Sequence, residues 1–190
     1  MLDNHDKWLQ GWLLPDYIKE KTQSFKSISG YLGSAPESIL DIGCGFAFES
    51  QQFYQQSKSN VWLLDGDFSN SPSRSDRLVR YGPAETMKFY NPIEKLKEYF
   101  DQHTDLKYRF VDATKIDIPE DTKFDLICSY LSCGYHYPVD TYQDLIRKHS
   151  HENTKIIMDI RPRTAHEQCF DIVEVIDRRP KYIKAEIKLK

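Results

Sequence analysis

The sequence predicts an α/β fold in which a mostly parallel sheet lies between two layers of helices, a three-layer, doubly wound arrangement. The first indication is an alternation along the chain, in which short apolar runs are followed by stretches whose apolar residues recur at helical spacing. The second is a turn with two glycines that directly follows the first apolar run, at residues 43–45. The third is a pair of β-rich runs, 170–177 and 182–189, which is typical of two antiparallel strands.

The individual elements follow from local signals. Residues from about 16 to 31 are expected to form a helix, because Pro15 suits its first turn and Gly30 and Gly33 suit its end. Buried strands are expected at the short apolar runs, 38–42, 60–65, 107–111, 124–129 and 155–160. Further helices are expected at the stretches of helical spacing, about 46–57, 92–102 and 139–150. The polar stretch 66–83 has no clear period and is expected to be a long loop.

Length and composition set limits on the kind of protein. A chain of 190 residues with 39% apolar and 29% charged residues is expected to form one soluble domain with a sizeable core. No apolar run is long enough to span a bilayer and the first residues lack a signal-peptide pattern, so a cytoplasmic protein without membrane contacts is expected. A net charge of −3 argues against nucleic acid as a partner, and four scattered cysteines without a C-x-x-C pair argue against a metal site.

The segment around the two glycines carries most of the functional information. Gly43 and Gly45 let the backbone adopt positive φ and let a ligand approach where a Cβ would collide. The helix that follows directs its free N–H groups and the positive end of its dipole toward the same place. Because such a turn lies at the carboxyl end of a parallel strand, where open α/β sheets bind their ligands, we expect a ligand site here.

The spacing around the turn distinguishes between ligands. A dinucleotide fingerprint, G-x-G-x-x-G, would place a third glycine at position 48, where this chain has Phe48. No G-K-[ST] sequence follows, so a phosphate cradle of the P-loop kind is not indicated either. Asp41, two residues before Gly43, is an unfavourable neighbour for phosphates and a favourable one for a cation. S-adenosylmethionine carries a sulfonium and an ammonium group and no phosphate, and it fits this pattern.

Four motifs follow one another along the chain: D-I-G-C-G-x-A at 41–47, V-W-L-L-D at 61–65, V-D-A at 111–113 and F-D-L-I-C-S at 124–129. In these motifs the chain resembles the class I S-adenosylmethionine-dependent methyltransferases, over roughly residues 35 to 160. The resemblance implies a seven-stranded, mostly parallel sheet with an antiparallel C-terminal strand pair, and S-adenosylmethionine as the cofactor. It also implies a single methyltransferase domain, residues 1–190, in which 1–35 form an N-terminal helical cap and 36–190 the cofactor-binding core.

The resemblance further implies roles for residues at the ends of the strands. The residues implied to border the cofactor at the first and fourth strands are Asp41, Gly43, Cys44, Gly45 and Ser129. Asp65 is the first choice for accepting hydrogen bonds from the ribose hydroxyls, and Asp67 is its rival because the D-G-D sequence permits either alignment. Asp112 is implied to accept from the adenine amine, and Ala113 to donate its backbone N–H to the ring. The alternatives are a capping or turn carboxylate at 65 or 67, and a helix N-cap at 112.

Two tyrosines and a histidine follow the fourth strand. The resembled family places this loop beside the methyl-bearing sulfonium, and aromatic rings contact such a cation favourably. We expect Tyr135 and Tyr137 to bind the acceptor, and His136 to act as a general base with a near-neutral pKa. The alternative for His136 is packing of the loop or stacking on the adenine.

Arg161 follows the fifth strand and is expected to face the same cleft. Its guanidinium is a candidate for holding a carboxylate or phosphate of the substrate. A surface ion pair with Asp159 or Glu167 is the alternative.

Together these features favour methyl transfer from S-adenosylmethionine to a small molecule. The expected acceptor atom is a hydroxyl, on a sugar or another polar metabolite, because a histidine base suits an oxygen nucleophile. The Asp/Asn-Pro-Pro-aromatic sequence of nucleic-acid amino-methyltransferases does not occur after the fourth strand. Two alternatives remain, a catalytically inert methyltransferase-like scaffold and an enzyme that uses the cofactor for another reaction, such as cleaving it. A lid is expected from the N-terminal helix and the loop 66–90.

Overall fold

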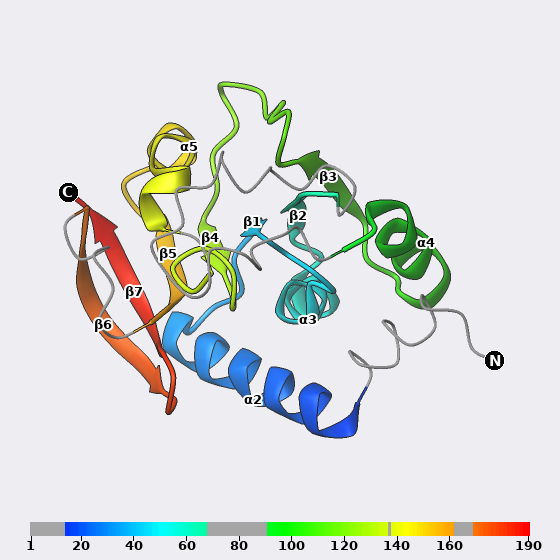
Figure 1. Ribbon diagram of the computed structural model, residues 1–190, viewed down its shortest axis with the longest axis horizontal. Helices are drawn as coiled ribbons and strands as arrows, with labels where there is room; N and C mark the ends of the chain where they lie inside the picture. Colours follow the sequence, from blue (N-terminus) through cyan, green and yellow to red (C-terminus); the bar gives the residue numbers. More distant parts are fainter. Residues whose placement is uncertain (1–13, 68–90, 137, 162–168) are drawn as a thin grey trace.

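The computed structural model describes residues 14–67, 91–136, 138–161 and 169–190. In these residues one sheet runs through the centre of the molecule (Figure 1). Its strands are β1 (Ser38–Ile42), β2 (Asn60–Asp65), β3 (Tyr108–Asp112), β4 (Leu126–Ser129), β5 (Lys155–Ile160), β6 (Phe170–Arg178) and β7 (Ile183–Leu189). Most of the predicted lid loop, and also Tyr137 and Glu167, lie outside the described residues.

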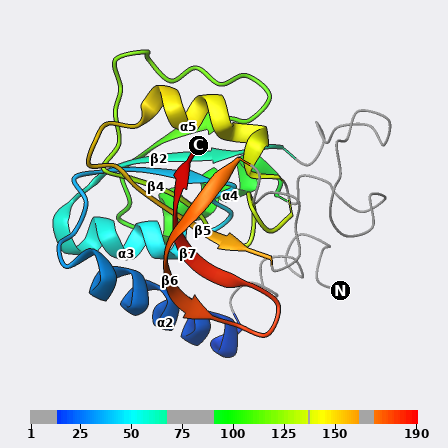
Figure 2. The same cartoon turned by 90° about the vertical axis from the view of Figure 1, so that its left-hand side faces the viewer.

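The strand order is β3-β2-β1-β4-β5-β7-β6. Strands β1 to β5 are parallel to one another, β7 is antiparallel to β5, and β6 is antiparallel to β7. The predicted seven-stranded, mostly parallel sheet with an antiparallel C-terminal strand pair is thereby confirmed. Figure 2 looks toward the side of the molecule formed by β6 and β7.

Among the described residues, one face of the sheet is covered by three helices, α2 (Pro15–Leu32), α3 (Phe48–Ser57) and α4 (Ile93–His103). They bury apolar side chains against the strands, among them Phe25, Phe53 and Phe100. Each of these phenylalanines removes a large apolar area from water, and that burial is the main force holding helix to sheet.

The other face is covered by α5 (Gln143–His149), which follows a 3₁₀ turn at Val139–Tyr142 and buries Ile146. Helices on both faces give the predicted three layers (Figure 1). The connection between β3 and β4, residues 113–125, holds no helix. In place of the helix that an alternation of strands and helices would put here, the chain is irregular. It buries Ile118 in the same apolar cluster as Ile146 of α5.

The turn between β1 and α3, residues 43–47, is called the Gly turn below. Gly43, Gly45 and Ala47 all have positive φ, of 69°, 49° and 49°. Because Ala47 is left-handed, α3 begins at Phe48 rather than at the predicted position 46. The turn is held over the neighbouring strand, since the N–H of Gly43 donates to the carbonyl of Leu64 (2.7 Å).

The strand order reverses at β1, whose neighbours are β2 on one side and β4 on the other. Loops that leave the carboxyl ends of such strands diverge to opposite faces, and the crevice between them is where open α/β sheets bind ligands. Here the crevice brings together the Gly turn, Asp65 at the end of β2, and residues 130–136 after β4. Residues 130–136 are called the site loop below.

A buried ion pair connects the C-terminal hairpin to this crevice. Lys184 of β7 donates to Asp159 of β5 (2.6 Å), and both side chains are 2% exposed. The second carboxylate oxygen of Asp159 accepts the backbone N–H of Leu131 in the site loop (3.0 Å). The hairpin therefore supports the site loop directly.

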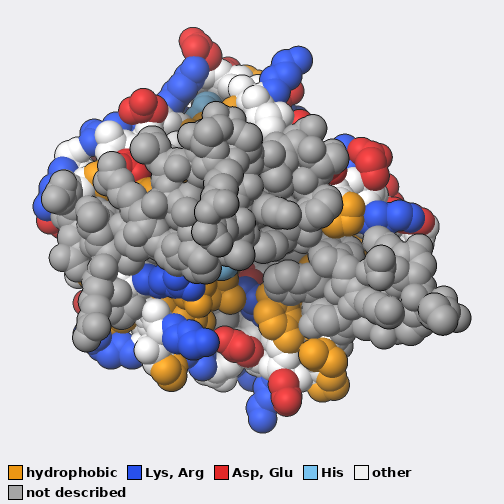
Figure 3. Space-filling view, viewed as in Figure 1, with side chains coloured by type: hydrophobic (Ala, Val, Ile, Leu, Met, Phe, Trp, Pro, Cys, Tyr) orange, Lys and Arg blue, Asp and Glu red, His pale blue; other side chains and the backbone are white. Residues whose placement is uncertain are grey.

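Among the described helices, none combines the length and the apolar character that crossing a membrane requires. Figure 3 shows the surface from the same side as Figure 1, and its lower part corresponds to the region of α2. Side chains of both charge signs are intermixed there with hydrophobic ones.

Candidate cofactor and acceptor site

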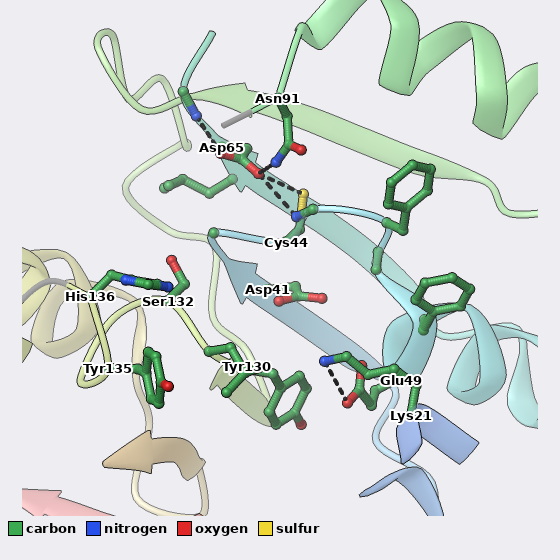
Figure 4. A pocket seen from close by; sticks show the side chains of 18 of the residues that line it. Lys21, Asp41, Cys44, Glu49, Asp65, Asn91, Tyr130, Ser132, Tyr135 and His136 are labelled. Atoms are coloured by element: carbon green, nitrogen blue, oxygen red, sulfur yellow. Dashed lines mark hydrogen bonds and ion pairs between the residues drawn. The ribbon is translucent and has the colours of Figure 1, made fainter. Parts of the chain in front are cut away.

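A cavity of about 360 Å³ lies in the crevice between the Gly turn and the site loop. This volume falls within the range of about 300–1,000 Å³ that is usual for small-molecule sites. Three groups of side chains in its wall are used below (Figure 4): the Asp65 end (Cys44, Asp65 and Asn91), the α2 end (Lys21 and Glu49) and the loop end (Ser132, Tyr135 and His136).

Gly43 lets the Gly turn and the site loop meet. A Cβ added to Gly43 would lie 1.8 Å from the Oγ of Ser132 and 2.5 Å from its Cβ. From the sequence we expect the missing side chain at Gly43 to leave space for a ligand. In the structure, Ser132 occupies that space. Gly45 differs, because the nearest atom to an added Cβ is the amide nitrogen of Asn91 at 3.9 Å. Its positive φ is the stronger restriction.

Asp65 is buried in the cavity wall at the end of β2. One carboxylate oxygen accepts from the backbone N–H of Gly45 (2.9 Å) and from the side-chain amide of Asn91 (3.0 Å). The thiol of Cys44 lies 4.0 Å from the same oxygen, and the other oxygen accepts from the N–H of Gly66 (2.8 Å). Burial raises the pKa of Asp65 above its usual value, and these hydrogen bonds oppose that shift. The carboxylate is thus held rigidly beside the Gly turn.

Asp67, the rival for the ribose, occupies a different place. Its carboxylate accepts the backbone N–H of Ile93 (2.9 Å), in the first turn of α4. It does not line the described cavity. This arrangement matches the capping role that the sequence offered as the alternative.

Asn91 was not among the residues singled out from the sequence. Its amide nitrogen donates to Asp65, whereas its side-chain oxygen is buried and has no hydrogen-bond partner among the described residues. It also lines the cavity. Because it comes 26 residues after Asp65, no spacing rule connects the two. Its only sequence signal is its position before Pro92, at the start of a helix.

Asp112 and Ala113, predicted at the adenine, lie outside the cavity wall. Asp112 accepts from the backbone N–H and the hydroxyl of Thr114 (2.8 and 2.7 Å). It thus closes a turn, and the helix N-cap named as the alternative is not formed, because no helix follows at 113–125. The N–H of Ala113 donates to the carbonyl of Asp65 (2.9 Å). In this structure the N–H therefore takes part in the pairing of β2 and β3, and its contact with the adenine ring stays a prediction.

Asp41 and Ser129 are both buried at the strand ends beneath the cavity. Asp41 lines the cavity and accepts from the hydroxyl of Ser50 (2.7 Å); burial raises its pKa to about 7. Ser129 donates to the carbonyl of Ile42 (2.7 Å) and accepts from the N–H of Cys133 (2.8 Å). Ser129 thus shapes the site loop and is not part of the described wall.

The α2 end holds an ion pair that sequence reasoning missed. Lys21 is buried in the cavity wall and donates to Glu49 in the first turn of α3 (3.2 Å), which also accepts from Ser24 (2.8 Å). Although burial disfavours its charge, the Glu49 carboxylate raises the pKa of Lys21 above its usual value. A signal was present, since Lys21 lies four residues from both Tyr17 and Phe25, on the apolar face of its helix.

At the loop end, His136 lines the cavity and its backbone N–H donates to the carbonyl of Ser132 (2.6 Å). Its ring packs edge-on against Tyr135 (4.9 Å between ring centres). Burial lowers the pKa of His136 to about 4, and the charge of Arg161 adds to the effect. The expected near-neutral pKa is thus wrong, because the ring lies in a partly dry wall beside a cation.

Arg161 also lines the cavity, and its guanidinium carbon lies 4.0 Å from the ring centre of Tyr135. Of the two alternative partners, Asp159 instead pairs with Lys184, and Glu167 lies outside the described residues. Tyr137, expected to bind the acceptor, is likewise outside them. Within the described part of the chain, His, Cys, Asp and Glu side chains form no group of three or more suited to a metal ion.

The strand order of the sheet is that of the class I S-adenosylmethionine-dependent methyltransferase fold. The Gly turn and Asp65, at the end of β2, line the same cavity in it. No protein-family model and no curated protein sequence matches the chain. The structure, in contrast, resembles solved structures over most of its length.

A ribosomal protein L11 methylase from Lactobacillus delbrueckii subsp. bulgaricus is 18% identical with a TM-score of 0.55, over 90% of this chain and 79% of that one. The PH0226 protein from Pyrococcus horikoshii OT3 is 13% identical with a TM-score of 0.63, over 94% and 93%. The plantazolicin methyltransferase BpumL, in complex with a monoazolic desmethylPZN analog and SAH, is 16% identical with a TM-score of 0.56. That match covers 83% of this chain and 53% of BpumL, about half of its length. At these identities the likeness establishes the fold alone.

Proposed function

We propose that the protein is an enzyme that transfers a methyl group from S-adenosylmethionine to a hydroxyl of a small polar molecule. The observation that carries the proposal is that the Gly turn, Asp65 and the loop with His136 all border one cavity at the strand reversal (Figure 4). The structural likeness to methyltransferases supports the reaction class, and BpumL was crystallised with SAH, the demethylated product. The acceptors of those proteins do not identify the acceptor here.

The Asp65 end fits the ribose of the cofactor. The buried side-chain oxygen of Asn91 lacks a donor among the described residues, and such atoms are almost always satisfied by a partner. A ribose offers two hydroxyl donors, and the carboxylate of Asp65 lies beside this oxygen as a second acceptor. Asp65 and Asn91 would together hold the ribose.

The α2 end fits the amino-acid part of the cofactor. Its Lys21–Glu49 pair presents both charge signs to the cavity, as an α-carboxylate and an α-ammonium group require. Tyr130 also lines the wall, but its hydroxyl is buried beside the thiol of Cys128. Lys21 would hold the carboxylate, and Glu49 the ammonium group.

When bound, S-adenosylmethionine supplies a methyl group made electrophilic by the sulfonium charge. His136 borders the same cavity with a pKa lowered to about 4, so its ring is neutral and can accept a proton throughout the neutral pH range. A hydroxyl becomes strongly acidic as its oxygen bonds to carbon, so even a weakly basic imidazole takes the proton at that stage. Ser132 holds the backbone of His136 in place for this transfer.

Calorimetric titration with SAH, and with NAD as the negative control, tests the cofactor site. A panel of small hydroxyl compounds with methyl-labelled S-adenosylmethionine, assayed for SAH and for labelled product, tests the reaction. Tight SAH binding without turnover on the panel would favour the inert scaffold, and cofactor consumption without an acceptor would favour another reaction.

The role of His136 has its own test. His136→Asn should lower kcat by about 10²–10⁴ while SAH affinity barely changes. Because the pKa of His136 is lowered to about 4, the wild-type rate should not fall through protonation of this ring between neutral pH and that value. Full turnover by the variant would contradict the general-base role.

A further inference from the structure

Asp41 is a buried carboxylate in the middle of the cavity wall. It lies in β1, is 2% exposed and lines the cavity. Figure 4 places it between Cys44 and Asp65 on one side and Lys21 and Glu49 on the other. A ligand that extends from the Asp65 end to the α2 end must therefore pass Asp41.

One oxygen of this carboxylate lacks a partner in the protein. The hydroxyl of Ser50 donates to the other oxygen of Asp41 (2.7 Å), and it is the one hydrogen-bond donor to this side chain among the described residues. Charges that are buried in proteins are usually paired as well as hydrogen-bonded. The second oxygen of Asp41 is therefore a position for a group that a ligand brings.

The charged groups around Asp41 do not balance its charge. Burial raises the pKa of Asp41 to about 7, and the hydrogen bond from Ser50 opposes the shift. The carboxylate of Glu49 raises this pKa by more than the ammonium group of Lys21 lowers it, and Asp65 raises it as well. Lys21 donates its hydrogen bond to Glu49 (3.2 Å) instead. Without a ligand, Asp41 thus lies in surroundings that disfavour its ionised form.

The remaining titratable neighbours are neutral. Burial raises the pKa values of the thiols of Cys44 and Cys128 and of the hydroxyl of Tyr130, and the charge of Asp41 adds to each shift. The ring of Tyr130 is already faced by the ammonium groups of two lysines, at 4.1 and 5.9 Å from its centre. A further cation in the cavity therefore finds its complement at Asp41, not at this ring.

The cofactor of the proposed function carries a cation between the two parts that the cavity ends would hold. In S-adenosylmethionine the sulfur atom joins the ribose to the amino-acid chain, and it is a positively charged sulfonium. In SAH the same sulfur is a neutral thioether. We propose that Asp41 is the counter-ion of the sulfonium and makes the protein distinguish S-adenosylmethionine from SAH, an inference that rests on the proposed function.

This role has a consequence for product release. In the transfer the methyl carbon bonds to the acceptor oxygen, the electron pair of the broken carbon–sulfur bond stays on sulfur, and the hydroxyl proton passes to His136. Asp41 then faces an uncharged sulfur and takes up a proton from water. The attraction that held the cofactor is absent for the product, which therefore leaves more readily.

The test compares SAH with sinefungin, an analogue of S-adenosylmethionine that has an ammonium group in place of the sulfonium and transfers no methyl group. Calorimetric titrations measure both affinities. In the wild type the ratio of sinefungin to SAH affinity should rise about tenfold from about pH 6 to about pH 8, because the ionised fraction of Asp41 rises by that factor around its pKa of about 7.

Asp41→Asn keeps an oxygen for Ser50 and removes the charge. The variant should bind SAH at least as well as the wild type and lose the rise of the ratio with pH. Titration of the ligands' own amines is the same in both proteins and cancels in the comparison. A ratio of affinities that Asp41→Asn leaves unchanged at both pH values would overturn the proposal.

A second readout counts protons. Titrations in two buffers that differ in protonation enthalpy give the number of protons released on binding. At about pH 6 sinefungin should release nearly one proton more from the wild type than from Asp41→Asn, whereas SAH should show no such difference. Equal differences for the two ligands would contradict a response of Asp41 to the cation.

Two further variants assign the effect. Ser50→Ala should move the rise of the ratio to higher pH, because the hydrogen bond from Ser50 lowers the pKa of Asp41. Asp67→Asn is the matched control, since it removes the same charge outside the cavity wall and keeps an oxygen for the N–H of Ile93. It should behave as the wild type, and an equal loss of the ratio's pH dependence in Asp67→Asn would overturn the assignment to Asp41.

The same titrations separate this inference from the proposed function. If neither SAH nor sinefungin binds, the cofactor site and with it the proposed function fail. If both bind and the ratio of their affinities does not depend on Asp41, the counter-ion inference alone fails.

Discussion

Ser132 occupies the place that a side chain on Gly43 would need. A Cβ added to Gly43 lies 1.8 Å from the Oγ of Ser132, and Gly43 has a φ of 69°. Two restrictions act at this residue, a steric clash and a backbone conformation that costs other residues about 1–2 kcal/mol. Gly43 therefore sets how closely the Gly turn and the site loop approach each other.

Gly43→Ala should destabilise the fold and weaken SAH binding, because the added methyl group displaces the loop that carries Ser132. Adding Ser132→Gly should recover part of the stability, since it removes both contacting atoms and leaves only the backbone strain. Chemical denaturation and calorimetric titration with SAH measure the two effects. Wild-type stability of Gly43→Ala would show that the loops do not meet as described.

Gly30→Ala is the control for this prediction. Gly30 lies inside α2, and a Cβ added there meets nothing within 4 Å. Alanine is favoured over glycine inside a helix by about 1 kcal/mol. This variant should therefore be slightly more stable than the wild type and bind SAH normally.

Asp65 and Asp67 should separate cofactor binding from stability. Asp65→Ala should weaken SAH binding by about 1–3 kcal/mol, the range for a lost hydrogen bond to a charged group. Asp67→Ala should leave SAH affinity unchanged and lower the unfolding free energy by about 0.5–2 kcal/mol, because it removes the acceptor for Ile93 at the start of α4. The reverse pattern would move the ribose site to Asp67.

The stability of the protein without ligand should depend on the protonation of Asp41. Burial raises the pKa of Asp41 from 3.8 to about 7, although the hydrogen bond from Ser50 opposes the shift. Between pH 3.8 and about 7, Asp41 keeps a proton in the folded state that it has lost in the unfolded chain. The stability that Asp41 contributes through its raised pKa is therefore complete below pH 3.8 and is lost as the pH rises to about 7.

Asp41→Asn keeps an oxygen that accepts from Ser50 and removes the titration. The variant should therefore gain stability relative to the wild type as the pH rises from about 4 to about 8. The comparison is made at each pH, because the lowered pKa of His136 makes its own contribution fall as the pH decreases. Denaturant unfolding at several pH values measures the difference, and a constant difference would contradict the raised pKa of Asp41.

Lys184→Met should destabilise the fold by about 3–5 kcal/mol, the usual effect of leaving a buried charge without its partner. The charge left behind is that of Asp159, whose side chain is 2% exposed. Lys188→Met, at an exposed position of the same strand, should change the stability by less than about 0.5 kcal/mol. Asp159→Asn added to Lys184→Met should restore part of the loss, since the amide oxygen still accepts from Leu131. No recovery would show that Lys184 acts through packing instead of charge.

The strands were predictable because a buried parallel strand consists of one short apolar run. Strands β1, β2 and β5 begin and end where the sequence predicts them. The start of α3 could not be predicted, because the left-handed conformation of Ala47 depends on how the Gly turn fits over Leu64. That fit leaves no pattern in the sequence. The connection 113–125 likewise could not be predicted in detail, because it packs against the sheet as irregular chain and its apolar residues show no helical spacing.

The site was predictable only in part, because a position at a strand end does not determine what a side chain contacts. From the sequence, Asp65 and Asp67 were both candidates for binding the ribose. Only the fold shows that Asp65 lies in the cavity wall and that Asp67 accepts a hydrogen bond at the start of α4. Asn91 enters the site from a distant point of the chain, which no local spacing reveals. Lys21 could have been found, as a charge on the apolar face of its helix.

Strand β7 comes after β6 in the sequence, yet it lies between β6 and β5 in the sheet. A ribosome delivers a chain from its N-terminus at about 5–20 residues per second, so β5 keeps an unpaired edge until residues 183–189 have emerged. During that interval Asp159 also lacks Lys184, its buried counter-ion. A nascent chain therefore passes through a stage in which an apolar strand edge is open to chaperones and to aggregation, and only the insertion of β7 ends it.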